Sequence, residues 1–322
     1  MEIVPADGAI LDEILAATFE IWHEGLSARA YPAYFKGQLA TAWGRAHLRR
    51  WALVNPGEVL ASVKEYPFHA TLDGRLISVL GFGAVFTQPR HRGRGYARRL
   101  LEQRLERAAR NGVDLALLFS EIGADYYARL GFQPIPTPVL ELHVHEDPRR
   151  GAPATLVRAG EDRDLADLVA MNQTRASGFR WHLNRDRDLI QYGIAKKRLL
   201  AGLTPAGVRH VLFFVAEEGA SAVAYALITT QGPVWTVEDA GDRDASGARL
   251  GAMLQVLVAR EPAEPRARID AWLPATLRPP QLDVVAERPS QEILMIHPLT
   301  PNGTPSTPLQ ASDVLYWHGD LF

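Results

Sequence analysis

The spacing of apolar residues changes along the chain, and each change predicts a different kind of element. Apolar residues recur at helical spacing over residues 10–19 and again over 39–51, so the first 55 residues are expected to be helical. A strand is expected over 59–66. The next two apolar runs, 68–72 and 76–80, flank an Asp-Gly pair that is typical of a hairpin turn.

Two glycines, Gly81 and Gly83, interrupt the second strand of this hairpin, which continues to Phe86. Glycine inside a strand predicts a bulge or the close approach of another backbone. The rest of the first half alternates between helices and strands, in the order helix 95–111, buried strand 115–119, short helix 125–130 and strands ending at 139–144. This order predicts an α/β fold, with a mixed central sheet flanked by helices.

The length of 322 residues predicts two domains. A polar segment rich in Pro and Gly, residues 146–154, is expected to be the linker, so the first domain would cover residues 1–145. Residues 155–297 loosely repeat the order of elements, with a hairpin followed by a helix, and are expected to form a second layer of the same kind. The tail, 298–322, ends in an aromatic stretch and is expected to dock, because such a terminus is unlikely to stay solvated.

Composition and charge exclude several classes of protein. Apolar residues make up 47% and charged residues 22% of the chain, so a disordered protein is excluded. The chain has no cysteine, which excludes disulfides and cysteine nucleophiles. A net charge of −2 predicts no nucleic-acid or membrane partner, and no apolar run approaches the length of a membrane span. The acidic N-terminus lacks the basic start of a signal peptide, so a cytoplasmic location is expected.

The strongest candidate for chemistry is an arginine- and glycine-rich segment between a predicted strand and a predicted helix. Eight arginines but only two glutamates lie between Phe86 and Arg110. Glycines let backbone N–H groups approach a ligand, and the start of the helix adds a positive dipole. The segment therefore predicts a site for a phosphate or pyrophosphate; the alternative is a solvated basic helix after a glycine-rich turn. It reads Val85-Phe86-Thr87-Gln88-Pro89-Arg90-His91-Arg92-Gly93-Arg94-Gly95-Tyr96-Ala97-Arg98.

Two motifs in this half resemble those of the GNAT N-acetyltransferases. Arg92-Gly93-Arg94-Gly95-Tyr96-Ala97 fits the family's acetyl-CoA signature, Arg/Gln-x-x-Gly-x-Gly/Ala, and the segment from Tyr126 to Phe132 resembles its FYxxxGF motif. The resemblance covers about residues 1–145 and implies a GNAT fold. It also implies that Val85, Phe86 and Thr87 bind the pantetheine arm of acetyl-CoA, that the loop from Arg92 to Arg98 holds its pyrophosphate, and that Tyr127 protonates the departing thiolate.

The resemblance does not supply the general base, because the family's usual glutamate on the strand before the loop is absent. Residues 77–87 contain no Asp, Glu or His, so the base must come from elsewhere or be dispensable. Glu121 follows a buried strand and is expected at the carboxyl end of the sheet, where ligands bind in α/β folds; its alternative role is that of a surface acid. The α-carboxylate of Phe322 is the other main candidate; alternatively, the last residues only cap the second domain's core. His23, Glu58 and Glu65 are further possibilities.

The second half resembles a degenerate GNAT domain. Residues 238–247 stand where the cofactor loop would be, but they carry four carboxylates, which would repel a pyrophosphate. Tandem arrangements of this kind suggest two relatives. One is the fungal lysine N6-acetyltransferase type, suggested by residues 120–123 before the tyrosines. The other is the mycobacterial enhanced-intracellular-survival acetyltransferases, in which the terminal carboxylate enters the active site.

The sequence thus predicts an enzyme that moves an acetyl group from acetyl-CoA to a primary amine by direct attack. The acceptor could be a lysine-like small molecule, a polyamine, an aminoglycoside or a protein lysine, and neither this choice nor the oligomeric state follows from the sequence. The alternative function is a catalytically weak acyl-CoA-binding sensor or scaffold. His143 and His145 share one face of a strand, but no third ligand is evident, so no metal is expected.

Overall fold

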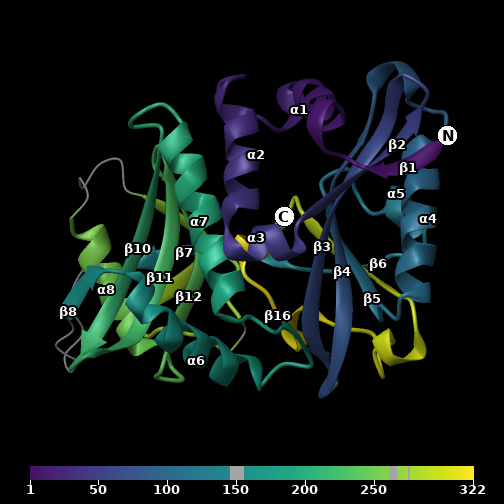
Figure 1. Cartoon of the computed structure of the whole chain (residues 1–322). Helices are drawn as coiled ribbons and strands as arrows, with labels where there is room; N and C mark the ends of the chain where they lie inside the picture. Colours follow the sequence, from purple (N-terminus) through teal and green to yellow (C-terminus); the bar gives the residue numbers. More distant parts are fainter. Residues whose placement is uncertain (146–155, 261–266, 275) are drawn as a thin grey trace. The chain divides into compact units, whose positions relative to one another are not determined.

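The chain forms two compact units, seen in a computed structural model that describes residues 1–145, 156–260, 267–274 and 276–322 (Figure 1). The first unit comprises Met1–Pro136, Gln291–Gln310 and Phe322, and the second comprises Thr137–Ser290 and Ala311–Leu321. Each unit is built on one mixed sheet with helices packed against it. This is the α/β fold class that the alternation of helical and strand-like spacing predicts, so that prediction is confirmed.

The sheet of the first unit has the strand order β1-β2-β3-β4-β5-β15-β6. Neighbours on this path are antiparallel except β4 and β5, which are parallel. The strands are β1 (Glu2–Pro5), β2 (Arg49–Asn55), β3 (Glu58–Leu72), β4 (Arg75–Thr87), β5 (Leu115–Ser120), β6 (Gln133–Ile135) and β15 (Ile293–Pro298). The helices are α1 (Gly8–Trp22), α2 (Ala30–Ala40), α3 (Ala42–His47), α4 (Tyr96–Arg110) and α5 (Asp125–Ala128), with short 3-10 turns at Pro89–His91 and Pro301–Gly303.

Successive side chains along a strand point to opposite faces of the sheet, and in the first sheet both faces carry apolar side chains. On one face, Leu100, Leu101 and Leu105 of α4 pack with Leu80 and Phe82 of β4 in one core cluster. On the other face, a smaller cluster joins α1 to β2 and β3. Figure 1 shows α4 on the opposite side of the strands from α1, α2 and α3. The sheet is therefore the middle of three layers, and its strands read as long apolar runs for that reason.

Most local signals of the first half are realised, but two strands, β1 and β2, lie within the first 55 residues, which were expected to be helical. The hairpin turn between β3 and β4 forms at Asp73 and Gly74, whose φ angles of 49° and 76° match the left-handed turn that an Asp-Gly pair favours. The expectation of helix through residue 51 is wrong, because β2 begins at Arg49. This segment pairs with both β1 and β3. Cross-strand pairing outweighs a helical spacing of apolar residues that continues by chance into the strand.

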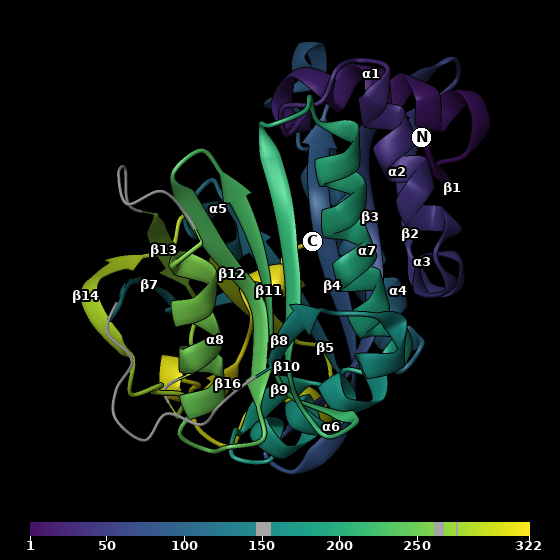
Figure 2. The same ribbon diagram turned by 90° about the vertical axis from the view of Figure 1, so that its left-hand side faces the viewer.

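The sheet of the second unit has the order β14-β7-β13-β12-β11-β10-β8. Figure 2 shows α8 on one face of its strands, and α6 and α7 pack with β10 and β11 in a separate cluster. The strands are β7 (Pro138–Val144), β8 (Leu156–Ala159), β10 (Arg209–Glu218), β11 (Ser221–Gln231), β12 (Val234–Asp242), β13 (Arg268–Ala271) and β14 (Leu282–Pro289), and β9 (Trp181–Leu183) pairs with β16 (Val314–Leu315). The helices are α6 (Leu165–Ala176), α7 (Arg187–Leu203) and α8 (Ala248–Val258), with 3-10 turns at Asp162–Asp164, Ala311–Asp313 and His318–Asp320. Among the described residues, no helix is long and apolar enough to cross a bilayer.

Each sheet contains one strand from the other part of the chain. β15 lies between β5 and β6 in the first sheet, and β7 lies between β13 and β14 in the second. The two sheets thus share one order of connections, with a parallel pair at β4–β5 and another at β12–β13. The domain boundaries expected at residues 145 and 297 therefore differ from those of the compact units. Strand pairing places β7 in the second unit and β15 in the first. The expected linker, residues 146–154, lies outside the described residues.

Candidate active site

The strand that precedes the arginine-rich loop changes its pairing at the predicted site. The parallel ladder between β4 and β5 joins Val79–Phe82 to Leu115–Leu118 and goes no further in the described ladders. β4 itself continues to Thr87. Its register with β3 shifts between Ser62 and Lys64, and Ala84 has a φ of 46°, which marks a bulge at this point. From Gly83 to Thr87, a stretch that includes Val85 and Phe86, β5 does not pair with β4. The backbone N–H and C=O groups on that edge of β4 therefore have no partner in the β4–β5 ladder.

The loop after β4 exposes backbone N–H groups at the start of a helix. Gly93 and Gly95 both have φ angles of 77°, and Gly95 is the residue that precedes α4. A Cβ at either glycine would meet nothing within 4 Å, so the space beside them is open. Among the described residues, no side chain caps the N-terminus of α4, and its first turn holds no acidic residue. The first amides of a helix have no partner within the helix, so this end can bind an anion.

Charged side chains surround this helix end. Arg92, Arg94 and Arg98 are exposed, and Arg98 is paired with Glu102 at 2.7 Å one turn along α4. Glu58 contacts Arg90 at 2.6 Å and His91 at 2.7 Å, which fixes the turn that leads into the loop. The hydrogen bond from His91 and the charge of Arg90 lower the pKa of the Glu58 carboxyl. Tyr96 and Ala97 complete the predicted set and are half-buried in the first turn of α4.

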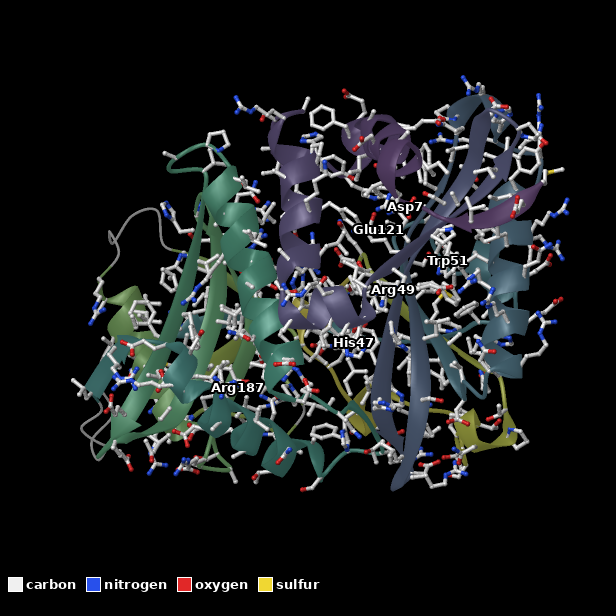
Figure 3. All side chains as sticks on the ribbon, viewed as in Figure 1. Asp7, His47, Arg49, Trp51, Glu121 and Arg187 are labelled. Carbon is white, nitrogen blue, oxygen red and sulfur yellow. The ribbon has the colours of Figure 1, made fainter. Side chains whose placement is uncertain are left out.

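A buried ion pair attaches α4 to the sheet. Arg104 donates to both carboxylate oxygens of Glu65 on β3, at 2.6 and 2.8 Å, and its guanidinium stacks 4.0 Å from the ring centroid of Trp51. The indole of Trp51, labelled in Figure 3, donates to the same carboxylate at 2.8 Å. A bidentate pair of this kind holds one orientation. The loop is therefore held at a defined place at the carboxyl end of β4, and Glu65 is occupied as an ion-pair partner.

Tyr127 lies in α5 with its ring in the core of the first unit. It is 7% exposed, and its ring centroid lies 5.0 Å from that of Tyr126 and 6.1 Å from that of Phe132. Burial, followed by the charges of Tyr126 and Glu121, raises the pKa of the Tyr127 phenol. A raised pKa keeps the phenol protonated at neutral pH, the state needed to donate a proton. Tyr126 is half-buried, and burial raises its pKa as well.

The last residue of the chain lies on β4. The ring centroid of Phe322 is 4.5 Å from that of Tyr66, 5.6 Å from that of Phe68 and 5.4 Å from that of Phe119. Its position requires two glycines. A Cβ at residue 81 would lie 2.5 Å from the ring of Phe322, and a Cβ at residue 83 would lie 2.8 Å from a carboxyl oxygen of Phe322.

The terminal α-carboxylate thus lies at the bulged end of β4, on the strand that leads into the arginine-rich loop. Sequence reasoning flagged the glycines as a place where another backbone could approach, but it missed the aromatic side chains that hold the terminal ring. The available signal was the alternation of Tyr66 and Phe68 on β3, which places both rings on one face of the hairpin, with Tyr66 paired with Gly81 in the register.

The remaining candidate bases have different surroundings in the structure. Glu121 directly follows β5 and is labelled in Figure 3. Burial raises the pKa of its carboxyl, and the nearby charges of Glu292 and Glu24 raise it further. Glu58 and Glu65 are engaged in the ion pairs described above. His23 accepts a hydrogen bond from the backbone of Gly25 in an exposed turn.

The second unit has a helix start of the same geometry, but its own carboxylate occupies it. Gly247 precedes α8 with a φ of 77°, like Gly95 before α4. Asp242 accepts hydrogen bonds from the backbone N–H groups of Leu250 and Asp244, both at 2.8 Å, and its side chain is fully buried. Asp244 in turn accepts from the backbone of Ser246. An internal anion therefore satisfies the amides that remain open at the start of α4.

The other two carboxylates of this segment lie on β12 and do not reach the helix start. Glu238 contacts Lys197 at 2.7 Å and His318 at 2.8 Å, and Asp239 contacts Arg185 at 2.6 Å. Burial alone would raise the pKa of Glu238, but Lys197 and His318 lower it well below its usual range. Of the four acids expected to repel a pyrophosphate, two thus serve as buried ion-pair partners. These pairs include side chains of the segment before the terminus, with Asp320 3.4 Å from Arg185.

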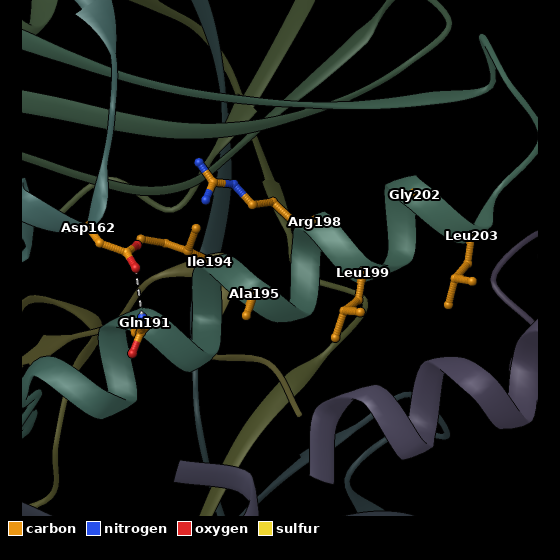
Figure 4. A pocket seen from close by; sticks show the side chains of 8 residues that line it. All are labelled: Asp162, Gln191, Ile194, Ala195, Arg198, Leu199, Gly202 and Leu203. Atoms are coloured by element: carbon orange, nitrogen blue, oxygen red, sulfur yellow. Dashed lines mark hydrogen bonds between the residues drawn. The ribbon is translucent and has the colours of Figure 1, made fainter. Parts of the chain in front are cut away.

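A pocket of about 540 Å³ lies along α7 in the second unit (Figure 4). Its wall is mostly apolar, and a hydrogen bond of 3.2 Å joins Asp162 to Gln191 at one end. It contains none of the residues that the sequence predicts for the site. The residues that line it are Asp162, Gln191, Ile194, Ala195, Arg198, Leu199, Gly202 and Leu203.

Comparison with known proteins agrees with the geometry of the first unit. Residues 14–135 match the family model described as an acetyltransferase (GNAT) domain. No curated protein sequence matches the chain. The matched residues include β4, the loop and α4, so the first unit carries a GNAT acetyltransferase domain. GNAT acetyltransferase domains transfer an acyl group from an acyl-CoA thioester, and residues 14–135 match this class of enzyme.

Solved structures share the fold at low sequence identity. A conserved Enterococcus faecalis protein described as a probable N-acyltransferase aligns with a TM-score of 0.69 at 13% identity, covering 92% of this chain and 72% of that one. A GCN5-related N-acetyltransferase from Anabaena variabilis gives 0.68 at 12% identity, with 93% and 73% covered. Eis1 from Mycobacterium abscessus gives 0.56 at 16% identity, with 93% and 74% covered. At these identities the likeness extends to the fold, and it includes residues of both units.

Proposed function

We propose that the protein transfers an acetyl group from acetyl-CoA to a primary amine by direct attack, with the α-carboxylate of Phe322 as the base and Tyr127 as the acid. The observation that carries the proposal is the position of Phe322 at Gly83. β4 has no acidic residue of its own beyond the hairpin, and the terminal carboxylate supplies one at the bulge. The resemblance to the enhanced-intracellular-survival acetyltransferases implies the same use of the terminus.

The loop and the strand before it fit the cofactor. The pyrophosphate of acetyl-CoA would bind the open amides from Gly93 to Arg98, with the arginines around it as counter-charges. Val85 and Thr87 lie beyond the ladder with β5, so their backbone groups could bond the amides of the pantetheine arm as a neighbouring strand would. Phe86 is 2% exposed and fixes this segment in the core.

Starting from an ammonium, the proposed reaction needs two protons removed from nitrogen and one supplied to sulfur. An ammonium substrate gives a proton through water to the Phe322 carboxylate, and the free amine attacks the thioester carbonyl. The tetrahedral intermediate collapses as the C–S bond breaks, and the CoA thiolate takes a proton from the phenol of Tyr127. The amide nitrogen loses its second proton to solvent. The products are the acetylated amine and CoA, with one proton released overall.

Glu121 is the alternative base. It lies at the end of β5, and its raised pKa suits a base that acts near neutral pH. The carboxylates of Glu24 and Glu292 contribute to that shift, so this region would also attract a cationic acceptor. We place Glu121 second because its carboxylate follows β5, whereas the terminal carboxylate lies on the strand that leads into the cofactor loop.

We further propose that the second unit is a GNAT-like domain that does not bind the cofactor. The identical order of strand connections in the two sheets supports the first part. The second part is supported by Asp242, whose carboxylate already accepts from the amide of Asp244 before α8 and from the amide of Leu250 in its first turn, so these two amides are not open to a phosphate. The expected stoichiometry is one acetyl-CoA for each chain.

The test is a CoA-release assay over a panel of amines that includes lysine, polyamines, aminoglycosides and a lysine-containing peptide, with acetyl-CoA hydrolysis as the background. Turnover well above hydrolysis with at least one amine class supports the proposal. Tight acetyl-CoA binding without turnover on any amine would favour the alternative, an acyl-CoA sensor or scaffold, in which the buried Tyr127 serves only packing. A protein that binds no acyl-CoA would contradict both.

A further inference from the structure

Two imidazoles and a carboxylate converge at the edge of the sheet of the second unit. His143 is on β7, and His145 directly follows that strand, so their side chains share one face. Asp283 is on the edge strand β14, where it pairs directly with His143 in the register. One nitrogen from each histidine and one oxygen of the aspartate all lie within 4.8 Å of one another. The sequence shows the two histidines, but only the strand pairing supplies the third group.

The internal geometry of this cluster fits a cation better than a simple ion pair. Nε2 of His145 is 2.9 Å from Oδ2 of Asp283 and is shielded from solvent, yet among the described residues it makes no aligned hydrogen bond. The two imidazole planes are 87° apart, with ring centroids 5.7 Å from each other. Ligand atoms of a tetrahedral zinc site are about 3.3 Å apart, given bonds of about 2.0–2.1 Å. Small side-chain rotations would bring the three atoms to that spacing.

The backbone on both sides of the cluster is held in place. The backbone N–H of His145 donates to Gln281 at 3.0 Å, and Gln255 on α8 donates to the carbonyl of His145 at 2.6 Å. On β14, Leu282 pairs with Val144 next to the cluster. Three ligand positions are therefore fixed by the sheet before any ion binds, which reduces the entropy lost on binding.

We propose that His143, His145 and Asp283 form a binding site for a divalent transition metal, with zinc as the best fit. Two imidazole nitrogens and one carboxylate oxygen suit zinc, cobalt, nickel or copper, whereas magnesium and calcium require mainly oxygen ligands. Because the protein supplies three ligands, water completes the coordination. Bound metal joins the edge strand β14 to β7, the strand that enters this sheet from the other part of the chain. The site therefore acts as a clamp on the sheet and is separate from the acetyl-transfer residues.

The test uses the full-length chain without a histidine tag, treated with a chelator and then dialysed. Titration with Zn²⁺ by calorimetry, and with Co²⁺ by visible absorption, should show one equivalent bound and the bands of a low-coordinate Co²⁺ site. Zn²⁺ should also raise the thermal unfolding midpoint, and Mg²⁺ and Ca²⁺ should not.

Matched variants locate the site. Removing even a supporting group costs roughly 10–100-fold in metal affinity, so His143→Ala, His145→Ala and Asp283→Asn should each weaken binding at least tenfold. His210→Ala, which removes an exposed histidine on β10 of the same unit, should bind as the wild type does. Equal affinity in all four variants, or a wild-type chain that shows neither Co²⁺ bands nor a shift with Zn²⁺, would overturn the proposal and leave only a close contact between His145 and Asp283.

Discussion

The carboxyl group of Phe322 lies directly against Gly83, where a Cβ would come within 2.8 Å of its oxygen. The two residues are 239 positions apart in the sequence (322 minus 83), and the contact exists because the chain end docks on a strand with no side chain at that point. No positive φ is required at Gly83, so the need for glycine there is one of space rather than of backbone conformation. This contact underlies the first prediction.

Neutralising the terminal carboxylate should lower activity while acetyl-CoA binding stays intact. A semisynthetic chain that ends in the carboxamide of Phe322 keeps the ring in its aromatic cluster and removes only the negative charge. If this group is the base, kcat/KM should fall by roughly 10²-fold or more, as is typical of general base catalysis. Gly83→Ala should act in the same direction by displacing the carboxylate, whereas Gly193→Ala, where a Cβ meets nothing within 4 Å, should not.

The pH profile of kcat/KM distinguishes the two candidate bases. A carboxylate base must be deprotonated, so activity rises as the pH increases through its pKa. Burial and the charges of Glu292 and Glu24 raise the pKa of Glu121, so an acid limb caused by Glu121 would lie above the usual glutamate range. We expect Glu121→Gln to keep the wild-type limb. Loss of that limb in this variant, with full activity in the carboxamide, would assign the base to Glu121.

Removing the phenolic hydroxyl of Tyr127 should affect the chemical step alone. Tyr127→Phe keeps the ring that packs against Phe132 and removes the proton donor. kcat should fall by roughly 10²-fold with little change in acetyl-CoA affinity, because a group that acts only in the transition state does not contribute to ground-state binding. Steady-state or stopped-flow kinetics measure kcat, and calorimetry measures the affinity for acetyl-CoA. Tyr126→Phe is the matched control and should stay close to wild type; equal losses in both variants would argue against the role.

The loop before α4 should lose its cofactor when a negative charge is added. Gly95→Glu and Gly95→Gln share the same backbone cost at a φ of 77°, and both side chains enter open space. Only the glutamate repels a pyrophosphate, so the ratio of the two dissociation constants isolates the charge. We expect binding to be abolished in Gly95→Glu and only weakened in Gly95→Gln, with one acetyl-CoA per wild-type chain by calorimetry. A wild-type stoichiometry of two would instead place a cofactor on the second unit.

The buried pair between Glu238 and Lys197 should stabilise the second unit in a pH-dependent way. Lys197 and His318 depress the folded-state pKa of Glu238 against the effect of burial. The stabilisation is therefore present above the unfolded-state pKa and is lost as the pH falls from about 4 through the folded-state value. Glu238→Gln leaves the largely buried Lys197, whose side chain is 12% exposed, without its partner, and should cost at most roughly 3–5 kcal/mol at pH 7. Chemical unfolding across pH checks this, and the control Glu218→Gln, at an exposed pair with Arg249, should leave the midpoint unchanged.

The first unit should not fold from residues 1–145 alone. β15 supplies Leu294, Met295 and Ile296 to its sheet, at 0%, 0% and 3% exposure, and pairs with both β5 and β6. A fragment that ends at residue 145 leaves β5 as an unpaired apolar edge, which favours aggregation. We expect an insoluble or unfolded fragment by circular dichroism, and recovery on co-expression with residues 146–322. A stable, folded fragment that binds acetyl-CoA would contradict the strand exchange as a requirement for folding.

Much of this protein follows from short-range patterns in the sequence. The turn at Asp73-Gly74 and the helix before Asn111 depend on φ preferences and side-chain spacing within a few residues, and both are present as predicted. The arginine and glycine signature also acts locally, since the open amides of the candidate anion site belong to the first turn of α4 and to the glycines before it. The fold class and the acyltransferase class both follow from such segments.

Tertiary structure decided what depends on partners far along the chain. The segment at Arg49–Asn55 is a strand because β1 and β3 pair with it. β7 and β15 belong to the sheets they occupy because each pairs there with a strand on both of its sides. The same is true of Phe322 at Gly83 and of Asp283 opposite His143. Each of these contacts closes a long loop, and its free energy comes from burial or pairing in the assembled sheet. Residue type and spacing alone do not specify which of many compatible segments a strand or side chain contacts.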